Sequence, residues 1–288
     1  MELLQLVYFC EAAKHENFST AAKHFYIPTS AISQSIRRLE SELSVPLFYR
    51  GGNRVKLSDE GKLFYDSAKK ALATLEDARL RLRELHDGVC GEIKLFIGNN
   101  RRTVVSVIEQ YRKKYPAVSF LLNHSEVSDP AEYDLLISGD MLRYAEMEKQ
   151  LLVREKLLLA IPAAHSLAQK KDLMLYDCKD ECFVSMHPGS SLRTVTEEVC
   201  KKVGFLPNFA VQRDDPVYIR KYIELGMGVS LIPSFSWKGQ LSSQVVLRDV
   251  GEFYRETYLM SHPSVQKPKC VTLFAEMLAI AFTSEAEM

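Results

Sequence analysis

The sequence predicts a multi-domain protein that is almost entirely helical up to about residue 86 and α/β from Glu92 onward. Helical periodicity with one short hairpin fills the first stretch. Beyond it, short β-rich runs alternate with helical stretches, which indicates a parallel sheet flanked by helices. The expected strands are Ile93–Ile97, Val118–Leu122, Asp134–Ser138, Leu157–Ile161, Phe183–Ser185, Phe209–Gln212, Val229–Ile232 and Thr257–Met260. Two glycines in the junction from Asp87 to Gly91 make it the expected domain boundary.

The composition is that of an ordinary folded protein. The 288 residues are 47% hydrophobic and 26% charged, which suits two or three compact units. No apolar run approaches the ~20 residues that a membrane-spanning helix needs, and no basic segment followed by an apolar one opens the chain. We therefore expect a cytoplasmic protein with no membrane partner. The formal net charge is zero, so an argument for nucleic acid has to rest on local placement.

The residues that usually carry catalysis or metals lack the required spacing. Cys178 and Cys182 are four residues apart rather than three, with no histidine cluster beside them. We expect reduced thiols, with a redox switch at Cys200 or at the Cys178/Cys182 pair as the alternative. A Gly-x-Ser-x-Gly motif is also missing. The prediction is therefore no enzyme, no catalytic residues, no metal and no cofactor.

Three helices are expected in the first 43 residues. Leu6 and Phe9 mark the inner face of the first, and Asn17 or Ser19 can cap the second. Pro28 then interrupts the chain. The third helix is expected to begin at Thr29 or Ser30, either of which can accept an amide hydrogen bond at a helix start.

The third helix has one apolar and one polar face. The apolar residues follow spacings of 4, 3 and 4: Ile32, Ile36, Leu39 and Leu43. The polar residues follow the same spacings on the opposite side: Ser30, Gln34, Arg37 and Ser41. Arginine can contact guanine with two hydrogen bonds, and glutamine can do the same with adenine. Two short helices joined by a tight turn, the second with a free polar face, are the helix-turn-helix pattern.

A basic hairpin follows these helices. Two alternating runs between Pro46 and Leu57 flank Gly51-Gly52-Asn53, which predicts a β-hairpin. Its exposed side carries Arg50, Arg54 and Lys56. Such a hairpin is a wing that can touch phosphates or enter the minor groove. Residues 1–57 hold seven Lys and Arg against five Asp and Glu, a local charge of only +2.

Over about its first 65 residues the chain resembles the LysR-type transcriptional regulators. The matching segments are Phe9, Phe18–Ala22, Ala31–Glu40, Leu47–Arg50 and Val55–Gly61. The resemblance implies a dimeric regulator with a winged helix-turn-helix domain at residues 1–58, whose third helix reads the major groove. The predicted DNA contacts are Thr29, Ser30, Ser33, Gln34, Arg37, Arg38, Arg50, Asn53 and Arg54. Gln34 stands where the family often has arginine, so the base preference usual in the family is not carried over to this chain.

A long linker helix is expected at residues 59–88. Ser58 can cap it, and Asp59 and Glu60 suit the positive end of the helix dipole. A heptad seam runs along it and consists of Phe64, Ala68, Ala71, Leu75, Ala78, Leu82 and Leu85. About 28 residues make a rod of ~42 Å. A small domain cannot cover so long a seam, so we predict dimerisation through it, with packing on the chain's own second domain as the alternative.

From residue 92 the chain resembles the effector domain of the same family, a two-lobed α/β fold like the type 2 periplasmic binding proteins. The matching segments include Tyr115–Val118, Tyr133–Ile137, Gly189–Arg193 and Gly226–Pro233. By that resemblance, lobe I spans 92–161 and 263–288 and lobe II spans 162–262. Two crossovers then form a hinge, and a ligand binds between the lobes.

Two expected helix starts indicate where that ligand binds. Asn99, Asn100 and Arg101 follow a strand and open a helix, and free amide groups beside guanidinium groups suit an anion. Ser190 and Ser191 open a second helix. The predicted effector contacts are Asn99, Asn100, Arg101, Ser138, Ser190, Ser191 and Met227. The alternative is that these are ordinary helix caps and surface arginines.

One short segment bears on the effector. Eleven residues separate Leu122 from Asp134, where the family usually has a further helix. We therefore expect a shallower cleft, or an effector that is unusual or absent. The predicted partners are double-stranded DNA, further copies in a homodimer or homotetramer, a small effector and RNA polymerase. The alternatives are a DNA-binding dimer with a degenerate sensor that binds no effector, or a solute-binding protein, which the lack of a signal segment disfavours.

Overall fold

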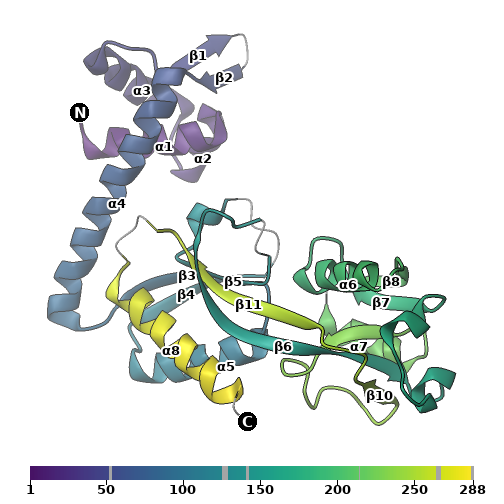
Figure 1. The fold of residues 1–288 in the computed structure, drawn as a ribbon. Helices are drawn as coiled ribbons and strands as arrows, with labels where there is room; N and C mark the ends of the chain where they lie inside the picture. Colours follow the sequence, from purple (N-terminus) through teal and green to yellow (C-terminus); the bar gives the residue numbers. More distant parts are fainter. Residues whose placement is uncertain (52–53, 125–128, 141–142, 214, 264–266, 287–288) are drawn as a thin grey trace. The chain divides into compact units, whose positions relative to one another are not determined.

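The structure is a computed structural model, and the chain divides into two units, Met1–Gly88 and Val89–Met288 (Figure 1). It describes all residues except 52–53, 125–128, 141–142, 214, 264–266 and 287–288. Within the described part, none of the helices is both long enough and apolar enough to cross a membrane. Each unit is considered by itself.

The first unit contains the three expected helices, the hairpin and the long helix. Its elements are α1 (Leu3–His15), α2 (Phe18–His24), α3 (Thr29–Leu43), β1 (Phe48–Gly51), β2 (Arg54–Leu57) and α4 (Asp59–Asp87). The two strands pair antiparallel, with Phe48 opposite Leu57. Phe9 of α1 and Ile32, Ile36 and Leu39 of α3 have no exposed surface. The predicted apolar face of the third helix is therefore confirmed.

The helix starts agree with the sequence in two cases of three. Asn17 Oδ1 accepts hydrogen bonds from Ser19 N (2.9 Å) and Thr20 N (3.1 Å), so Asn17 caps α2 as expected. The expected cap of α3 is wrong: Pro28 is the N-cap residue, and it provides no side-chain hydrogen bond. Because Thr29 is already helical, its hydroxyl lies past the capping position.

The start of α4 is packed closely against the segment before the hairpin. Ser58 Oγ accepts from Gly61 N (2.8 Å) and donates to Pro46 O (2.8 Å), which confirms the predicted cap. Ser58 N also donates to Leu47 O (2.9 Å). A Cβ atom at Gly61 would lie 2.1 Å from Leu47 O, well inside van der Waals contact. Only glycine therefore allows the helix to approach this backbone.

The second unit combines one large mixed sheet, one small sheet and helices on both (Figure 1). Its strands are β3 (Gly91–Ile97), β4 (Val118–Asn123), β5 (Leu135–Ser138), β6 (Glu148–Pro162), β7 (Cys182–Met186), β8 (Asn208–Arg213), β9 (Ser230–Pro233), β10 (Val245–Arg248) and β11 (Tyr254–Ser261). Its helices are α5 (Arg101–Lys114), α6 (Ser191–Lys202), α7 (Pro216–Glu224) and α8 (Lys269–Ala286), with short 3-10 turns η1 (Pro130–Glu132), η2 (Ser166–Gln169) and η3 (Leu175–Cys178).

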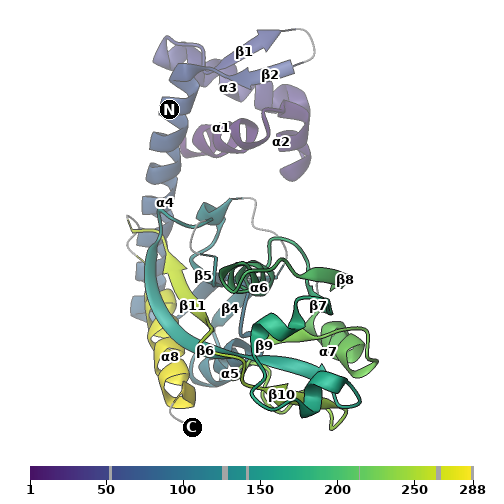
Figure 2. The same cartoon turned by 45° about the vertical axis from the view of Figure 1, so that its right-hand side comes forward.

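The expectation of a parallel sheet is only partly correct. Strand β3 pairs parallel with β4 and β5, and β7 pairs parallel with β8. Strands β6 and β11, however, pair antiparallel with each other, and β9 and β10 pair antiparallel with β6. The reason is that β6 leaves the first half of the unit and β11 returns to it, so the two passages run in opposite directions (Figure 2).

Two large hydrophobic cores and one smaller cluster fill the second unit, and β6 contributes to both large cores. On β6, Val153 belongs to the first core and Leu157 to the second. On the return path, Val250 belongs to the second core and Leu259 to the first. The chain thus passes from the first core to the second between Val153 and Leu157, and returns between Val250 and Leu259. The lobe boundaries at 161/162 and 262/263 stay predictions.

The connection between β4 and β5 is short, as the sequence indicates. Among its described residues, the only regular element is the single turn η1. Asp129 Oδ1 caps this turn by accepting a hydrogen bond from Ala131 N (2.9 Å).

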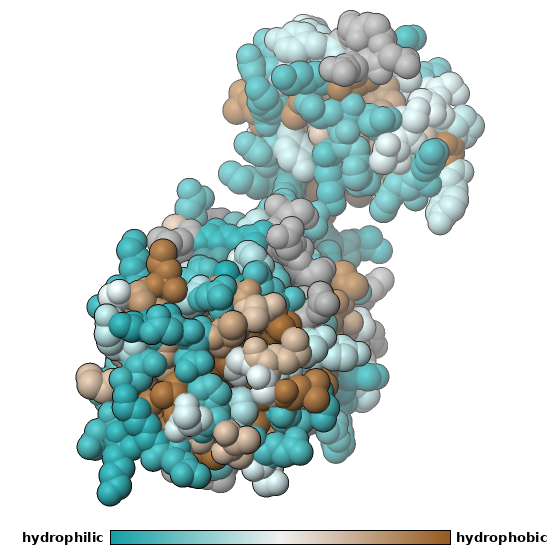
Figure 3. All heavy atoms as spheres, turned by 90° about the vertical axis from the view of Figure 1, so that its right-hand side faces the viewer, coloured by the Kyte–Doolittle hydropathy of each residue, from teal (hydrophilic) through white to brown (hydrophobic). Residues whose placement is uncertain are grey.

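On the face shown in Figure 3, exposed apolar side chains lie among hydrophilic ones.

Replacing Gly61 by alanine should destabilise the first unit by about 1–3 kcal/mol, because the added methyl group collides with Leu47 O. Helix propensity alone would instead make the alanine variant more stable by about 1 kcal/mol. A loss of stability therefore indicates the collision, and a gain indicates that propensity dominates. Urea denaturation of the full chain followed by circular dichroism measures it. Fluorescence of Trp237, the only tryptophan, reports the second unit separately.

Lys70→Ala, at an exposed position of the same helix, is the matched control and should leave the midpoint nearly unchanged. An unchanged or higher midpoint for Gly61→Ala would show that the helix start relaxes without strain.

Candidate nucleic-acid interface and effector cavity

The polar face of α3 is exposed along its length. Ser30, Gln34 and Arg37 are exposed, as are Thr29 and Arg38. The remaining predicted contact on this helix, Ser33, is half-buried. These side chains point away from the core because Ile32, Ile36 and Leu39 occupy the opposite side. The arrangement presents hydrogen-bonding groups of the kind that read base edges in the major groove.

Two carboxylates that the sequence analysis did not single out hold the wing in place. Glu40 Oε1 of α3 accepts from Leu47 N (2.9 Å) and Phe48 N (3.2 Å) at the entrance to β1. Glu16 Oε1, just after α1, accepts from Leu57 N (2.9 Å) at the end of β2. Two of the five acidic residues in this domain thus connect the wing to the helices, and the local net charge of +2 is unchanged by these contacts.

Aromatic contacts connect the wing to the helices. The ring centroid of Phe48 lies 5.7 Å from that of Phe9 and 5.1 Å from that of Phe18. Tyr49 and Lys56 of the hairpin are exposed. The predicted contact Asn53 lies outside the described residues, and the side chains of Arg50 and Arg54 are likewise not described. Their roles stay predictions.

The predicted seam on α4 divides into two parts. Ala68 is 4% exposed and packs in the core of the first unit, and the Phe64 ring lies 5.2 Å from that of Phe9. Ala68 is therefore used within the domain, a correction to the prediction that it faces a partner. Phe64 is half-buried, and its role at a partner stays a prediction. The exposed positions of the seam are Ala71, Leu75, Ala78 and Leu82. The side chain of Leu85 is not described.

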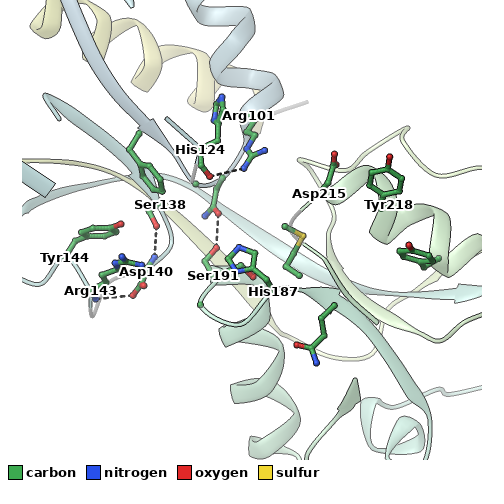
Figure 4. Close-up of a pocket in the computed structure, with 18 residues that line it drawn as sticks. Arg101, His124, Ser138, Asp140, Arg143, Tyr144, His187, Ser191, Asp215 and Tyr218 are labelled. Carbon is green, nitrogen blue, oxygen red and sulfur yellow. Dashed lines mark hydrogen bonds between the residues drawn. The ribbon is translucent and has the colours of Figure 1, made fainter. Parts of the chain in front are cut away.

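A cavity of about 1030 Å³ lies between the two cores of the second unit (Figure 4). Five predicted contacts line it: Asn99, Arg101, Ser138, Ser190 and Ser191. The Asn99 side-chain amide and the Ser191 hydroxyl are hydrogen-bonded at 2.8 Å, joining the starts of α5 and α6. Ser190 Oγ caps α6 by accepting from Arg193 N (3.2 Å). The prediction that these two helix starts share a cavity is therefore confirmed.

The cavity also contains groups that the sequence analysis missed. Figure 4 shows Asp140, Arg143 and Tyr144 beside the predicted Ser138 on one side, and Asp215 and Tyr218 on the other. Further lining residues are Phe96, His124, Met186, His187, Gln212 and Tyr222. Tyr218 and Tyr222 are four residues apart, so they share one face of α7, which is the sequence signal that could have revealed them. The lining combines aromatic rings with charges of both signs.

Two predicted effector contacts lie elsewhere. Met227 follows α7, is 43% exposed and is not among the residues that line the cavity. Asn100 is buried: its Nδ2 donates to Glu155 Oε2 (3.4 Å) and its Oδ1 accepts from Thr257 Oγ1 (3.1 Å). Its backbone is left-handed, with φ of 51°, which turns the side chain away from the large cavity and into the interior.

The cysteines and histidines form no metal centre in the part of the chain that the structure describes, since no three metal-binding side chains gather there. Burial raises the pKa of Cys178 to about 12, helped by Glu181 and Asp177, and burial likewise raises the pKa of Cys200 to about 12. Such thiols are almost fully protonated and therefore poor nucleophiles. The redox alternative gains no support at these two positions.

Comparison with protein families assigns both parts of the chain. Residues 3–62 match the family described as "Bacterial regulatory helix-turn-helix protein, lysR family", and residues 86–282 match the "LysR substrate binding domain". The second match alone covers more than half of the 288 residues.

Individual relatives agree with this assignment. The transcriptional dual regulator GltC of Bacillus subtilis (strain 168) is 33% identical over 242 residues, covering 81% of each chain. Two solved structures share the fold. Corynebacterium glutamicum OxyR (C206 mutant) has a TM-score of 0.61 at 19% identity, covering 99% of this chain and 93% of that one. Full-length CbnR in complex with its target DNA has a TM-score of 0.61 at 20% identity, covering 98% and 100%. On the family matches and the GltC identity, the chain belongs to the LysR family of bacterial helix-turn-helix transcriptional regulators.

Proposed function

We propose that this DNA-binding regulator reads a promoter with Ser30, Gln34 and Arg37, and that a small organic acid in the large cavity of its second unit controls it. Two copies joined along α4 would place two α3 helices on half-sites about one DNA turn, or roughly 34 Å, apart. RNA polymerase is the partner that a promoter-bound regulator would influence. The observation that carries the proposal is the exposed polar face of α3 opposite its fully buried apolar face.

The chemistry of the cavity supports an organic acid. Arg101 and Arg143 can pair with a carboxylate, while Asp140 and Asp215 can accept hydrogen bonds from an amino or hydroxyl group. The rings of Tyr144, Tyr218 and Tyr222 provide the apolar contact area that small-molecule sites usually contain. A carboxylate-bearing molecule with an apolar body and one further polar group fits this lining.

The alternative, a sensor domain that binds nothing, is less well supported. The described part of the connection between β4 and β5 contains only the short turn η1, yet the cavity measures about 1030 Å³, near the upper end of ligand-binding cavities. Charged side chains also converge on it from both halves of the unit. A cavity without a ligand would have no need for such groups.

Arg37→Ala should weaken binding to the preferred DNA by about 1–3 kcal/mol and relax base preference at one position, because a bidentate base contact is lost. Lys56→Ala should instead weaken binding to all sequences and lower the slope of log affinity against log salt by about 1. Fluorescence anisotropy, with DNA selected by the unmodified protein from a random library, measures both.

Arg112→Ala, an exposed arginine near the end of α5, controls for the loss of one positive charge. If Arg37→Ala and Arg112→Ala bound the selected DNA equally well, α3 would not be the reading helix.

Leu82→Glu should weaken self-association of the full chain, because it places a charge in the exposed part of the α4 seam. Analytical ultracentrifugation over a range of concentrations should then show a lower average mass than for the unmodified chain. Leu63→Glu is the matched control: Leu63 is 75% exposed on the same helix but lies outside the seam. A monomeric unmodified chain, or equal behaviour of the two variants, would contradict dimerisation through this seam.

Arg101→Ala should weaken binding of the organic acid that binds the unmodified chain most tightly by about 1.5–3 kcal/mol, the range for a hydrogen bond to a charged group. Tyr218→Ala should weaken it through lost ring contact. Isothermal titration calorimetry with a panel of organic acids measures both, and Arg112→Ala again controls for charge. Equal affinities in all variants would remove this cavity as the effector site.

A further inference from the structure

A second cavity, of about 310 Å³, adjoins the first and has a different lining. The two share the starts of α5 and α6, including Asn99, Arg101 and Ser191. The rest of the smaller cavity is built from α7, from the segment after β9 and from β11. Its volume is at the lower end of the range for small-molecule sites.

Positive charge dominates this smaller cavity. Four arginines line it, from three different elements: Arg101, Arg102, Arg220 and Arg255. Of the described residues that line it, Asp215 is the only one with a carboxylate. Glu155 lies behind the wall and pairs with Arg255, so it offsets one guanidinium. An excess of positive charge around a concave space attracts a small anion.

Arg255 is the innermost of these arginines. It is 5% exposed, and its Nη2 donates to Glu155 Oε2 (2.6 Å) and Ser236 Oγ (2.9 Å). Its Nε is buried and has no hydrogen-bond partner among the residues that the structure describes. Buried polar groups are nearly always hydrogen-bonded, so an unsatisfied donor on a cavity-lining residue indicates a missing acceptor.

The outer wall carries a partly dehydrated cation beside an aromatic ring. The Arg220 guanidinium lies 5.2 Å from the centre of the Trp237 ring. Burial lowers the pKa of Arg220, and Asp215 and Glu224 partly oppose that effect. Charges that are shielded from water interact more strongly than exposed ones. Arg102, at the start of the 14-residue helix α5, is exposed beside this wall.

We propose that the smaller cavity is a second ligand site, which binds a small organic anion through a carboxylate or phosphate group held by Arg102, Arg220 and Arg255. Guanidinium groups suit both kinds of oxyanion because they offer paired donors. Arg102, Arg220 and Arg255 line only the smaller cavity, so an anion held by them occupies a different position from a ligand in the larger one. Because the two cavities share part of their walls, a ligand in one would change the affinity of the other, and the effect would be reciprocal.

The single tryptophan makes the proposal directly testable. Since Trp237 is the only tryptophan and lines the smaller cavity, its fluorescence reports on this site. The full chain is titrated with malonate, succinate and inorganic phosphate at constant ionic strength, and with malonamide and succinamide as neutral counterparts. We expect a saturable change with at least one anion and none with the amides. Comparing malonate with phosphate shows which oxyanion is preferred.

Variants then locate the response. Arg102→Gln and Arg220→Gln should each raise the Kd about tenfold, as expected when one charged contact is lost. Arg112→Gln, outside both cavities, and Arg143→Gln, which lines only the larger one, should leave it unchanged. If Arg220→Gln disturbs the Trp237 fluorescence or the fold, the Kd of Arg102→Gln is compared with that of Arg112→Gln alone. Calorimetry with the same anion confirms each Kd.

Three results would overturn the proposal: no saturable response to any of the anions, equal affinities in Arg102→Gln and Arg112→Gln, or a loss confined to Arg143→Gln, which would place the anion in the larger cavity. None of these results would affect DNA binding by α3 or the organic-acid effector. The second site can therefore fail while the proposed function stands.

Discussion

The buried ion pair between Glu155 and Arg255 lies where β6 and β11 pass from one core of the second unit to the other. Its two atoms are 2.6 Å apart, and both side chains are almost fully buried. Glu155 also accepts from Ser236 N (2.6 Å), and Asn100 contacts both partners from the start of α5. Removing one member would leave an uncompensated buried charge, at a cost of about 3–5 kcal/mol. Both cavities take part of their walls from elements that this network joins.

In the DNA-binding unit, polar side chains likewise connect elements that are distant in the sequence. Glu40 and Glu16 accept backbone amides at the beginning and end of the hairpin, and Phe48 packs its first strand against the helices. The wing is thus held by the same helices that position the polar face of α3. A count of charges treats these two carboxylates as opposing DNA, whereas their contacts show that they fix the geometry of the interface.

The sequence predicted elements well where the signal is local, and poorly where it is not. The face of α3 and the caps at Asn17 and Ser58 follow from spacing and residue type within one or two turns. Strand β10 was missed, and β6 was expected at a third of its length. The first part of β6, Glu148–Lys156, places three apolar residues between two runs of charged and polar residues, so it lacks the alternation that indicates a strand. In the cavity, Asn99, Arg101 and three serines were predicted, but its tyrosines were not.

By itself, the sequence determined the family, the order of the domains and which side of α3 faces solvent, since each depends on residues close together in the chain. Tertiary structure alone decided that Asn100 turns inward to Glu155, that Ala68 is used within its own domain, and that four arginines converge on one small cavity. Those arginines come from three elements between residues 101 and 255. Contacts of that range arise only when β6 and β11 bring distant segments together, which local periodicity does not encode.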